Sequence, residues 1–153
     1  MYELDEKDKL LLELLQKNGR ESLTIIARKL GLSIDSTHKR IKKLQNAGVI
    51  DNFGVFINPR PLGYELIANV QIKLTNISEE QMNKFIAFLK NHKNVITLVS
   101  IIGDYDLTCV IIAKDANELE QISRYIRQKY SALIADWRSV INLKVHKLEE
   151  YSF

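Results

Sequence analysis

The sequence predicts an α+β protein built from two domains with different periodicities. Up to about residue 46, apolar side chains recur at helical spacing, which indicates short helices that share a core. Beyond residue 64 they alternate with polar side chains in several short runs, which indicates strands. The segment 58–63 between these parts holds both prolines of the 153-residue chain. We therefore predict a helical domain over residues 1–58, a linker over 59–64 and a mixed domain over 65–153.

The composition suits a compact protein and excludes several classes. Hydrophobic residues make up 46% of the chain, which is ample for packed cores. No apolar run is long enough to span a membrane, and the acidic start does not resemble a signal peptide, so we expect a cytoplasmic protein. The single cysteine, Cys109, excludes an internal disulfide and a thiolate metal cluster, and we expect a buried, inert thiol. We predict no cofactor and no metal site.

Three helices are predicted before the linker. The first runs from a cap at Asp5 to Lys17, and the second follows a cap at Ser22, covers residues 23–30 and ends at Gly31. The third begins at a Ser33 cap and continues to residue 46. One stripe of this third helix is predicted to pack on the second helix, and it consists of Ile34, Thr37, Ile41 and Leu44. Two short helices joined by so tight a turn predict a helix–turn–helix.

The other face of the third helix is basic. Residues 28–43 contain six bases and one acid, whereas residues 1–27 contain four bases and six acids. A solvated helix face would explain charge alone, but here the charge is gathered on the helix whose geometry suits a DNA groove. We predict base contacts from Ser36, Lys39 and Lys43, and phosphate contacts from Arg40 and Lys42. For His38 we favour packing or a phosphate contact. The full predicted DNA-binding set is Ser33, Ser36, His38, Lys39, Arg40, Lys42 and Lys43.

The chain after the third helix predicts a short extension and then a sheet. The strand-like run NFGVFIN, residues 52–58, suggests a winged or extended helix–turn–helix. Strands are then predicted at 66–74, 94–102, 106–113 and 137–148. Helices follow a capping box at Ser78 and a cap at Asp115. This order, strand, helix, strand, strand, helix, strand, is that of a ferredoxin-like βαββαβ domain with a four-stranded antiparallel sheet. Apolar residues on both faces of its middle strands indicate that another subunit covers one face.

These residues resemble the Lrp/AsnC, or feast/famine, family of transcriptional regulators over nearly the whole chain. The resemblance implies a homodimer joined through the carboxy-terminal sheets, further assembly into tetramers or octamers, and an amino acid or related small metabolite bound at contacts between dimers. One departure is Thr37, because this position is usually aliphatic in the family. The matching residues are Leu4-Asp5, Asp8, Arg20, Ile26-Ala27, Leu30 to Ser33, Arg40-Ile41, Leu44, Gly48 to Ile50, Pro59, Leu62-Gly63 and Gly103 to Asp106.

The turn Gly103-Asp104-Tyr105-Asp106 has two interpretations. Glycine and aspartate are ordinary hairpin residues, and such a turn needs no ligand. The resemblance instead implies that this turn lies beside the effector site. Gly103 would then let the backbone approach a bound amino acid, and Asp104 or Asp106 would accept its ammonium group. We therefore take Gly103, Asp104, Tyr105 and Asp106 as the candidate effector-binding residues.

We predict a sequence-specific DNA-binding regulator that responds to an amino acid or related metabolite. Two symmetry-related helices would enter successive major grooves about 34 Å apart, so the double-stranded DNA operator should be roughly palindromic. One alternative is an enzyme, because sirohaem decarboxylases resemble the same two-domain fold. His92 and His146 are the only histidines of the second domain, and neither joins a catalytic constellation visible in the sequence, so we expect no enzymatic activity. Another alternative is an effector-independent architectural protein, which would differ in its specificity for DNA.

Overall fold

The protein folds into two compact units, and each is described by itself. The structure is a computed structural model that describes residues 2–75 and 78–152. The first unit comprises Met1–Phe56 together with His146–Phe153, and the second comprises Ile57–Val145. The tail thus groups with the helical unit, whereas the predicted division had placed it in the sheet domain.

Three helices form the first unit: α1 (Glu6–Lys17), α2 (Leu23–Leu30) and α3 (Ile34–Asn46). Each begins at a predicted cap, where the side chain of Asp5, Ser22 or Ser33 accepts a hydrogen bond from a first-turn amide. Gly31 ends α2 in the left-handed conformation, with φ 62°. The helices share a core of buried side chains, which consists of Leu11, Leu12, Ile26, Leu30 and Leu44.

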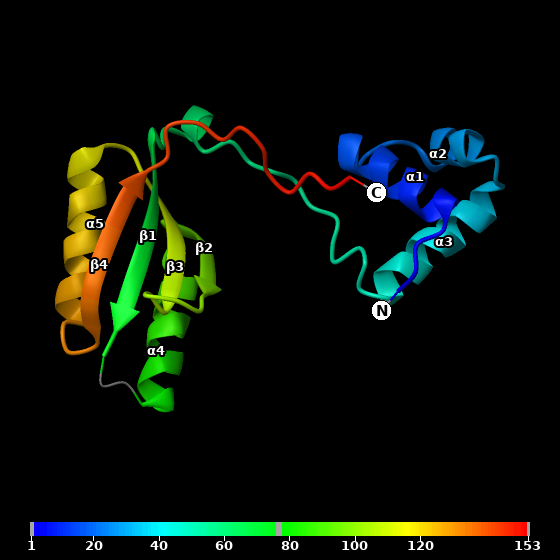
Figure 1. The fold of residues 1–153 in the computed structure, drawn as a ribbon. Coiled ribbons are helices and arrows are strands. Elements are labelled where there is room, and N and C mark those ends of the chain that lie inside the picture. The colour runs from blue at the N-terminus through cyan, green and yellow to red at the C-terminus, as the bar shows by residue number, and fades with distance from the viewer. Residues whose placement is uncertain (1, 76–77, 153) are drawn as a thin grey trace. The chain divides into compact units, whose positions relative to one another are not determined.

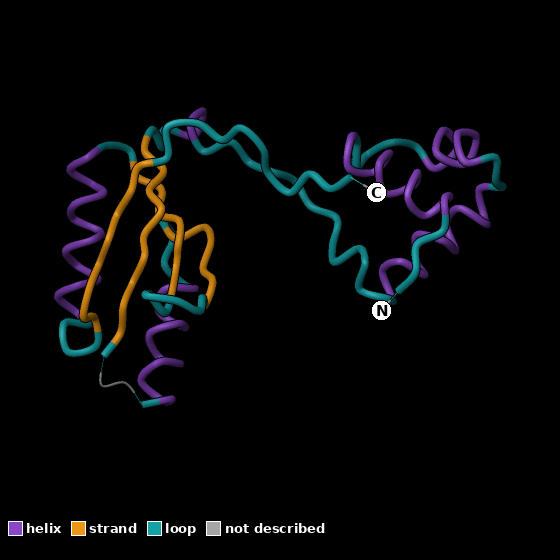
Figure 2. Tube along the Cα trace, viewed as in Figure 1, coloured by secondary structure: helices purple, strands orange, loops and turns teal. Residues whose placement is uncertain are grey.

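The strand expected after α3 is not formed. Residues 51–58 have no strand structure, and Figure 2 shows this segment as loop. Val55 and Phe56 are 79% and 82% exposed. No strand of the described residues pairs with this segment, so its alternating sequence has no ladder to join. The helix–turn–helix is therefore not winged within the described chain.

The second unit has the predicted order of elements. After a short 3₁₀ turn (Arg60–Leu62) come β1 (Leu66–Leu74), α4 (Glu79–Lys90), β2 (Val95–Ser100), β3 (Leu107–Ala113), α5 (Ala116–Lys129) and β4 (Ile134–Ile141). The four strands form one sheet in the order β2-β3-β1-β4, and every neighbouring pair is antiparallel (Figure 1). This is the ferredoxin-like arrangement that the sequence predicted.

Helices α4 and α5 pack on one face of this sheet. Phe85 and Leu89 of α4 and Ile126 of α5 are fully buried against strand residues. Cys109 of β3 lies in the same core, and burial raises the pKa of its thiol to about 12. The expectation of a buried, unreactive thiol therefore agrees with its surroundings. The strand side chains in this core are Ala68, Val70, Ile72, Leu107, Cys109 and Ile111.

The last strand is shorter than predicted. We expected it to continue to residue 148, but β4 ends at Ile141. Its partner explains this, because Ile141 pairs with Ala68 and the Asn142 amide donates to the Ile67 carbonyl, close to the start of β1. Beyond that point there is no partner strand, and the apolar alternation of residues 143–148 cannot be used in a ladder.

The chain then returns to the first unit. The amide of Tyr151 donates to the Gln16 side chain at 2.8 Å, and the Gln16 side-chain nitrogen donates back to the Tyr151 carbonyl at 3.2 Å. This pairing joins the tail to the end of α1.

No helix of the described residues is long and apolar enough to cross a membrane.

Candidate nucleic-acid interface and effector site

One face of α3 is fixed in the core of the first unit, and this decides which face is free. Thr37 and Leu44 are completely buried. The Thr37 hydroxyl donates to the Ser33 carbonyl at 2.9 Å, so the residue that departs from the family pattern satisfies its polar group locally. The opposite face of the helix must then be exposed.

Five of the predicted DNA-binding residues lie on this exposed side: Ser36, His38, Lys39, Lys42 and Lys43. Lys39 forms an exposed ion pair with Asp35, at 2.8 Å between Nζ and the carboxylate. The Lys43 ammonium lies 5.3 Å from the centre of the Tyr2 ring. Ser33 is also exposed, but its hydroxyl caps the helix and donates to Ser36 Oγ at 2.8 Å. The free face of α3 is thus basic, although Lys39 and Lys43 have contacts of their own.

Arg40 has a different place from the one expected of a phosphate ligand. Its guanidinium pairs with the carboxylates of Asp5 and Asp8, and its side chain is only 22% exposed. Asp8 is 1% exposed, so this pairing neutralises a buried charge. The hydrogen bonds from Arg40 hold the pKa of the Asp5 carboxyl below its usual value. Arg40 therefore links α3 to α1. This role can be recognised only from the three-dimensional packing.

Ile34 was predicted to lie in the buried stripe, and this was wrong. It is 50% exposed, because it is the first residue of α3 and precedes the first buried position, Thr37, by almost one turn. Periodicity could not show that the packed contact begins only at Thr37 and leaves the first residue of the helix half exposed.

The predicted effector turn divides into structural and free side chains. The carboxylate of Asp106 accepts a hydrogen bond from the Leu74 amide at 2.7 Å, which ties the turn to the end of β1. The hydroxyl of Tyr105 donates to Asp136 of β4 at 2.8 Å. Asp104 is exposed, and its carboxylate has no hydrogen bond or ion pair with the described residues. Gly103 has φ 153°, in a region that side chains rarely adopt.

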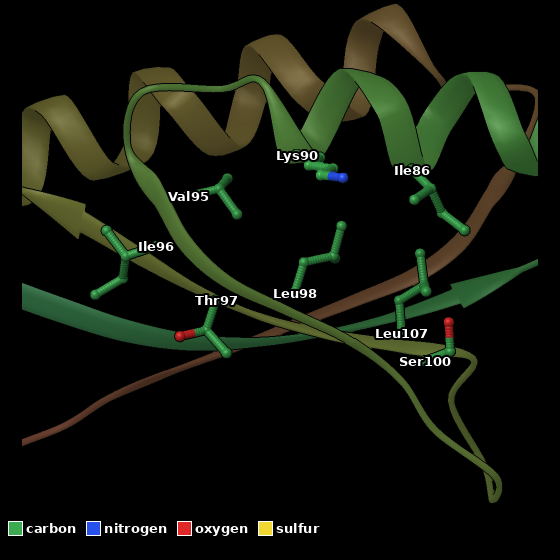
Figure 3. A pocket seen from close by; sticks show the side chains of 8 residues that line it. All are labelled: Ile86, Lys90, Val95, Ile96, Thr97, Leu98, Ser100 and Leu107. Atoms are coloured by element: carbon green, nitrogen blue, oxygen red, sulfur yellow. The ribbon is translucent and has the colours of Figure 1, made fainter. Parts of the chain in front are cut away.

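A separate hollow of about 310 Å³ lies between α4 and the edge strand β2. Figure 3 shows Val95 and Leu98 pointing toward α4, with Lys90 on the helix side. None of the four turn residues lines it. The pairing register of β2 shifts between Val95 and Thr97, an irregularity that the sequence pattern did not reveal. The turn and this hollow are thus distinct candidate places for a small molecule in the second unit. The described residues contain no group of acidic, histidine and cysteine side chains suited to a metal ion.

Comparisons with known proteins find two family models, one for each part of the chain. Residues 4–45 match the model of the AsnC-type helix-turn-helix domain, and residues 67–150 match that of the Lrp/AsnC ligand binding domain. The transcriptional regulator FL11 of Pyrococcus furiosus is 31% identical over 144 residues, which cover 94% of this chain and 92% of FL11. The regulator Ptr1 of Methanocaldococcus jannaschii is 34% identical over 133 residues, covering 86% and 84% of the two chains.

Solved structures show the same fold. A transcriptional regulator from Neisseria meningitidis in complex with L-methionine superposes with a TM-score of 0.84, at 21% identity, over 95% of this chain and 94% of that one. The feast or famine regulatory protein of Mycobacterium tuberculosis, complexed with L-methionine, gives 0.81 at 26% identity over 97% and 98%. These relatives are named as transcriptional regulators, which supports the expectation of no enzymatic role. The names give no support to the decarboxylase alternative. The chain belongs to the Lrp/AsnC family of transcriptional regulators.

Proposed function

We propose that the protein recognises a specific, roughly palindromic DNA operator through the free face of α3 and that an amino acid adjusts this binding. The observation that carries the DNA part is the two-sided character of α3. Thr37 and Leu44 are fully buried on one side, while three lysines are exposed on the other. A recognition helix needs this arrangement, because one side must pack while the other enters a major groove.

The contacts within the unit refine the roles of the basic residues. Lys39 and Lys43 remain candidates for base edges, together with Ser36. Lys42 and His38 remain candidates for phosphate contacts. Arg40 is engaged with Asp5 and Asp8, so we now assign it to positioning α3 rather than to DNA.

Single substitutions of Lys39 and Lys43 test this assignment. We expect Lys39→Ala and Lys43→Ala each to weaken binding to an operator selected from random DNA. Where the lysine also contacts a DNA phosphate, the slope of log affinity against log salt concentration should fall by about one. Lys84→Ala, an exposed lysine of α4 in the other unit, is the matched control. If neither variant changes affinity or salt slope relative to this control, another face contacts DNA.

For the effector we favour an amino acid bound beside the turn after β2. Support comes from the match to a ligand binding domain and from two structural relatives in complex with L-methionine. Within the turn, Asp104 is the side chain suited to accept an ammonium group, because Asp106 already binds the Leu74 amide.

Calorimetric titration with the twenty amino acids tests the effector. We expect heat of binding from one amino acid or a small group of them, and we expect Asp104→Asn to abolish it. Asp136→Asn, which alters the hydrogen bond between Asp136 and Tyr105 of the turn, serves for comparison. A flat response to all twenty amino acids would remove amino acids as effectors.

Dimerisation through the sheet would place two copies of α3 on one operator. The face of the sheet opposite α4 and α5 is covered by no element of the described second unit. Side chains that lie directly opposite one another in antiparallel pairs share a face, which places Val99, Thr108 and Val110 on this side. Val99 and also Val140 of β4 are about half exposed, at 46% and 52%. Exposed β-branched side chains on an uncovered sheet face suit burial against a second copy.

A further inference from the structure

We propose that Ile34 reads the methyl group of thymine in the operator. This inference rests on the proposed DNA-binding function of α3 and adds a specificity residue to it. Ile34 is 50% exposed. Among the described residues of α1, α2 and α3, the other exposed large apolar side chains are Leu10 and Ile25, and both are less exposed. Covering this isoleucine with a partner would be favourable, because its exposed apolar surface would be removed from water.

The polar side chains around Ile34 have partners within α3 itself. Ser33 and Ser36 are hydrogen-bonded to one another at 2.8 Å. Asp35 pairs with Lys39, also at 2.8 Å. These polar groups have local partners in the free protein, and Ile34 adds an exposed apolar side chain at this end of α3.

Position and charge together indicate which partner covers this surface. The amino-terminal residues of a recognition helix are those that meet base edges in the major groove. Ile34 and His38 stand four residues apart and share a flank of α3 beside the exposed Lys39 and Lys42. A partner protein with an apolar patch would have to approach against these lysines, whereas DNA is attracted by them. Within the major groove, the apolar group that a base pair offers is the thymine C5-methyl.

Replacing thymine by uracil removes this methyl group and leaves the base-pairing groups unchanged. The DNA probe is an operator selected from random DNA with the full-length chain, and deoxyuridine is then introduced at each thymidine position in turn. For the wild-type protein we expect one or two positions in each half-site at which uracil weakens binding about four-fold, the factor that corresponds to one buried methyl group.

The variant Ile34→Ala completes a cycle between protein and DNA. We expect it to bind the thymine operator about five-fold more weakly than the wild type, and to be insensitive to uracil at the same positions. Ile34→Val should keep most of the sensitivity, because one branch of the side chain remains. Leu10→Ala on α1, where Leu10 is 38% exposed, is the matched control and should bind both operators as the wild type does. Thermal unfolding verifies that all variants are folded.

The outcomes separate the two proposals. If the wild type selects an operator but Ile34→Ala binds as tightly as the wild type, the assignment of Ile34 is overturned while the proposed function stands. Equal sensitivity to uracil in the wild type and in Ile34→Ala has the same meaning. If the wild type does not bind DNA or shows no sequence preference, the proposed function fails and the assignment fails with it.

Discussion

Arg40 shows how one side chain can hold the recognition helix in place. It bridges α3 to the first turn of α1 by pairing with Asp5 and with the buried Asp8. On sequence alone it is one more base in a basic helix, and the partners that define its role lie 35 and 32 residues earlier in the chain.

Removal of this guanidinium should destabilise the first unit. In Arg40→Ala the buried Asp8 carboxylate would lose its cationic partner and keep only the Asp5 amide as a donor, which costs about 3 kcal/mol. Chemical denaturation followed by circular dichroism measures the change in the free energy of unfolding. Lys42→Ala, an exposed base on the same helix, should change stability little. Equal stability of the two variants would contradict the role assigned to Arg40.

The same bridge should respond to acid. The pKa of Asp5 is lowered in the folded protein, mainly by its hydrogen bond with Arg40. Its contribution to stability is therefore fully present above the unfolded pKa of about 3.9, and it is lost as the pH falls through the lower folded value. Acid unfolding of Asp5→Asn compared with the wild type tests this, and the stability difference between them should shrink below pH 4. A difference that stays constant down to pH 2 would exclude this coupling.

At the level of secondary-structure elements, the turn between β2 and β3 is joined to β1. Asp106 accepts the amide of Leu74, and the Asp106 amide donates to the Ile72 carbonyl at 3.0 Å. The end of β1 is thus fastened to the same segment that carries Asp104. An effector bound at Asp104 would therefore contact a turn that two hydrogen bonds hold against β1.

Two substitutions separate the neighbouring acids. Asp106→Ala leaves the part-buried amide of Leu74 without its side-chain acceptor and should destabilise the sheet unit by about 1–2 kcal/mol. Asp104→Ala, at an exposed position, should leave stability near that of the wild type. Thermal unfolding of both variants measures this contrast. Similar losses for the two would mean that Asp104 also has a structural role.

At the scale of the whole chain, the two units are connected twice. The chain leaves the first unit near Phe56, and the tail returns to it at His146. The Gln16–Tyr151 pairing holds this tail on α1. A segment that follows β4 directly is therefore part of the DNA-binding unit.

Release of the tail should loosen the end of α1. We expect truncation after Lys147, or Gln16→Ala, to speed hydrogen exchange of the amides in the last turn of α1 while exchange in α4 stays unchanged. Mass spectrometry of peptides from both helices provides the measurement and its internal control. Unaltered exchange in α1 would show that the pairing contributes nothing to the stability of this helix.

Dimerisation can be tested on the uncovered sheet face. Val110→Glu would place a charge in the centre of the proposed interface, and we expect it to yield monomers that bind a palindromic operator weakly. Asn83→Glu, on the exposed side of α4, should leave assembly unchanged. Analytical ultracentrifugation measures both. A Val110→Glu protein of wild-type mass would show that the subunits associate elsewhere.

Local signals were sufficient for most of the fold. Asp5, Ser22, Ser33 and Ser78 all cap helices as predicted, because a cap depends on residues within three positions of it. The alternation over 66–74 likewise predicted β1 with its correct bounds. The same local reasoning extended β4 too far and predicted a strand after α3, because a strand also requires a partner that periodicity does not show.

The sequence by itself determined the order of elements, the two domains and the family, since these depend on spacing, caps and residue identity along the chain. Only the tertiary structure decided that Arg40 bridges helices, that Ile34 is exposed, that Asp106 is engaged while Asp104 is free, and that the tail joins the first unit. Each of these features depends on contacts between groups that are distant in the sequence, and local spacing does not show such contacts. Buried charges and amides need partners, and the folded chain decides which groups are close enough to serve.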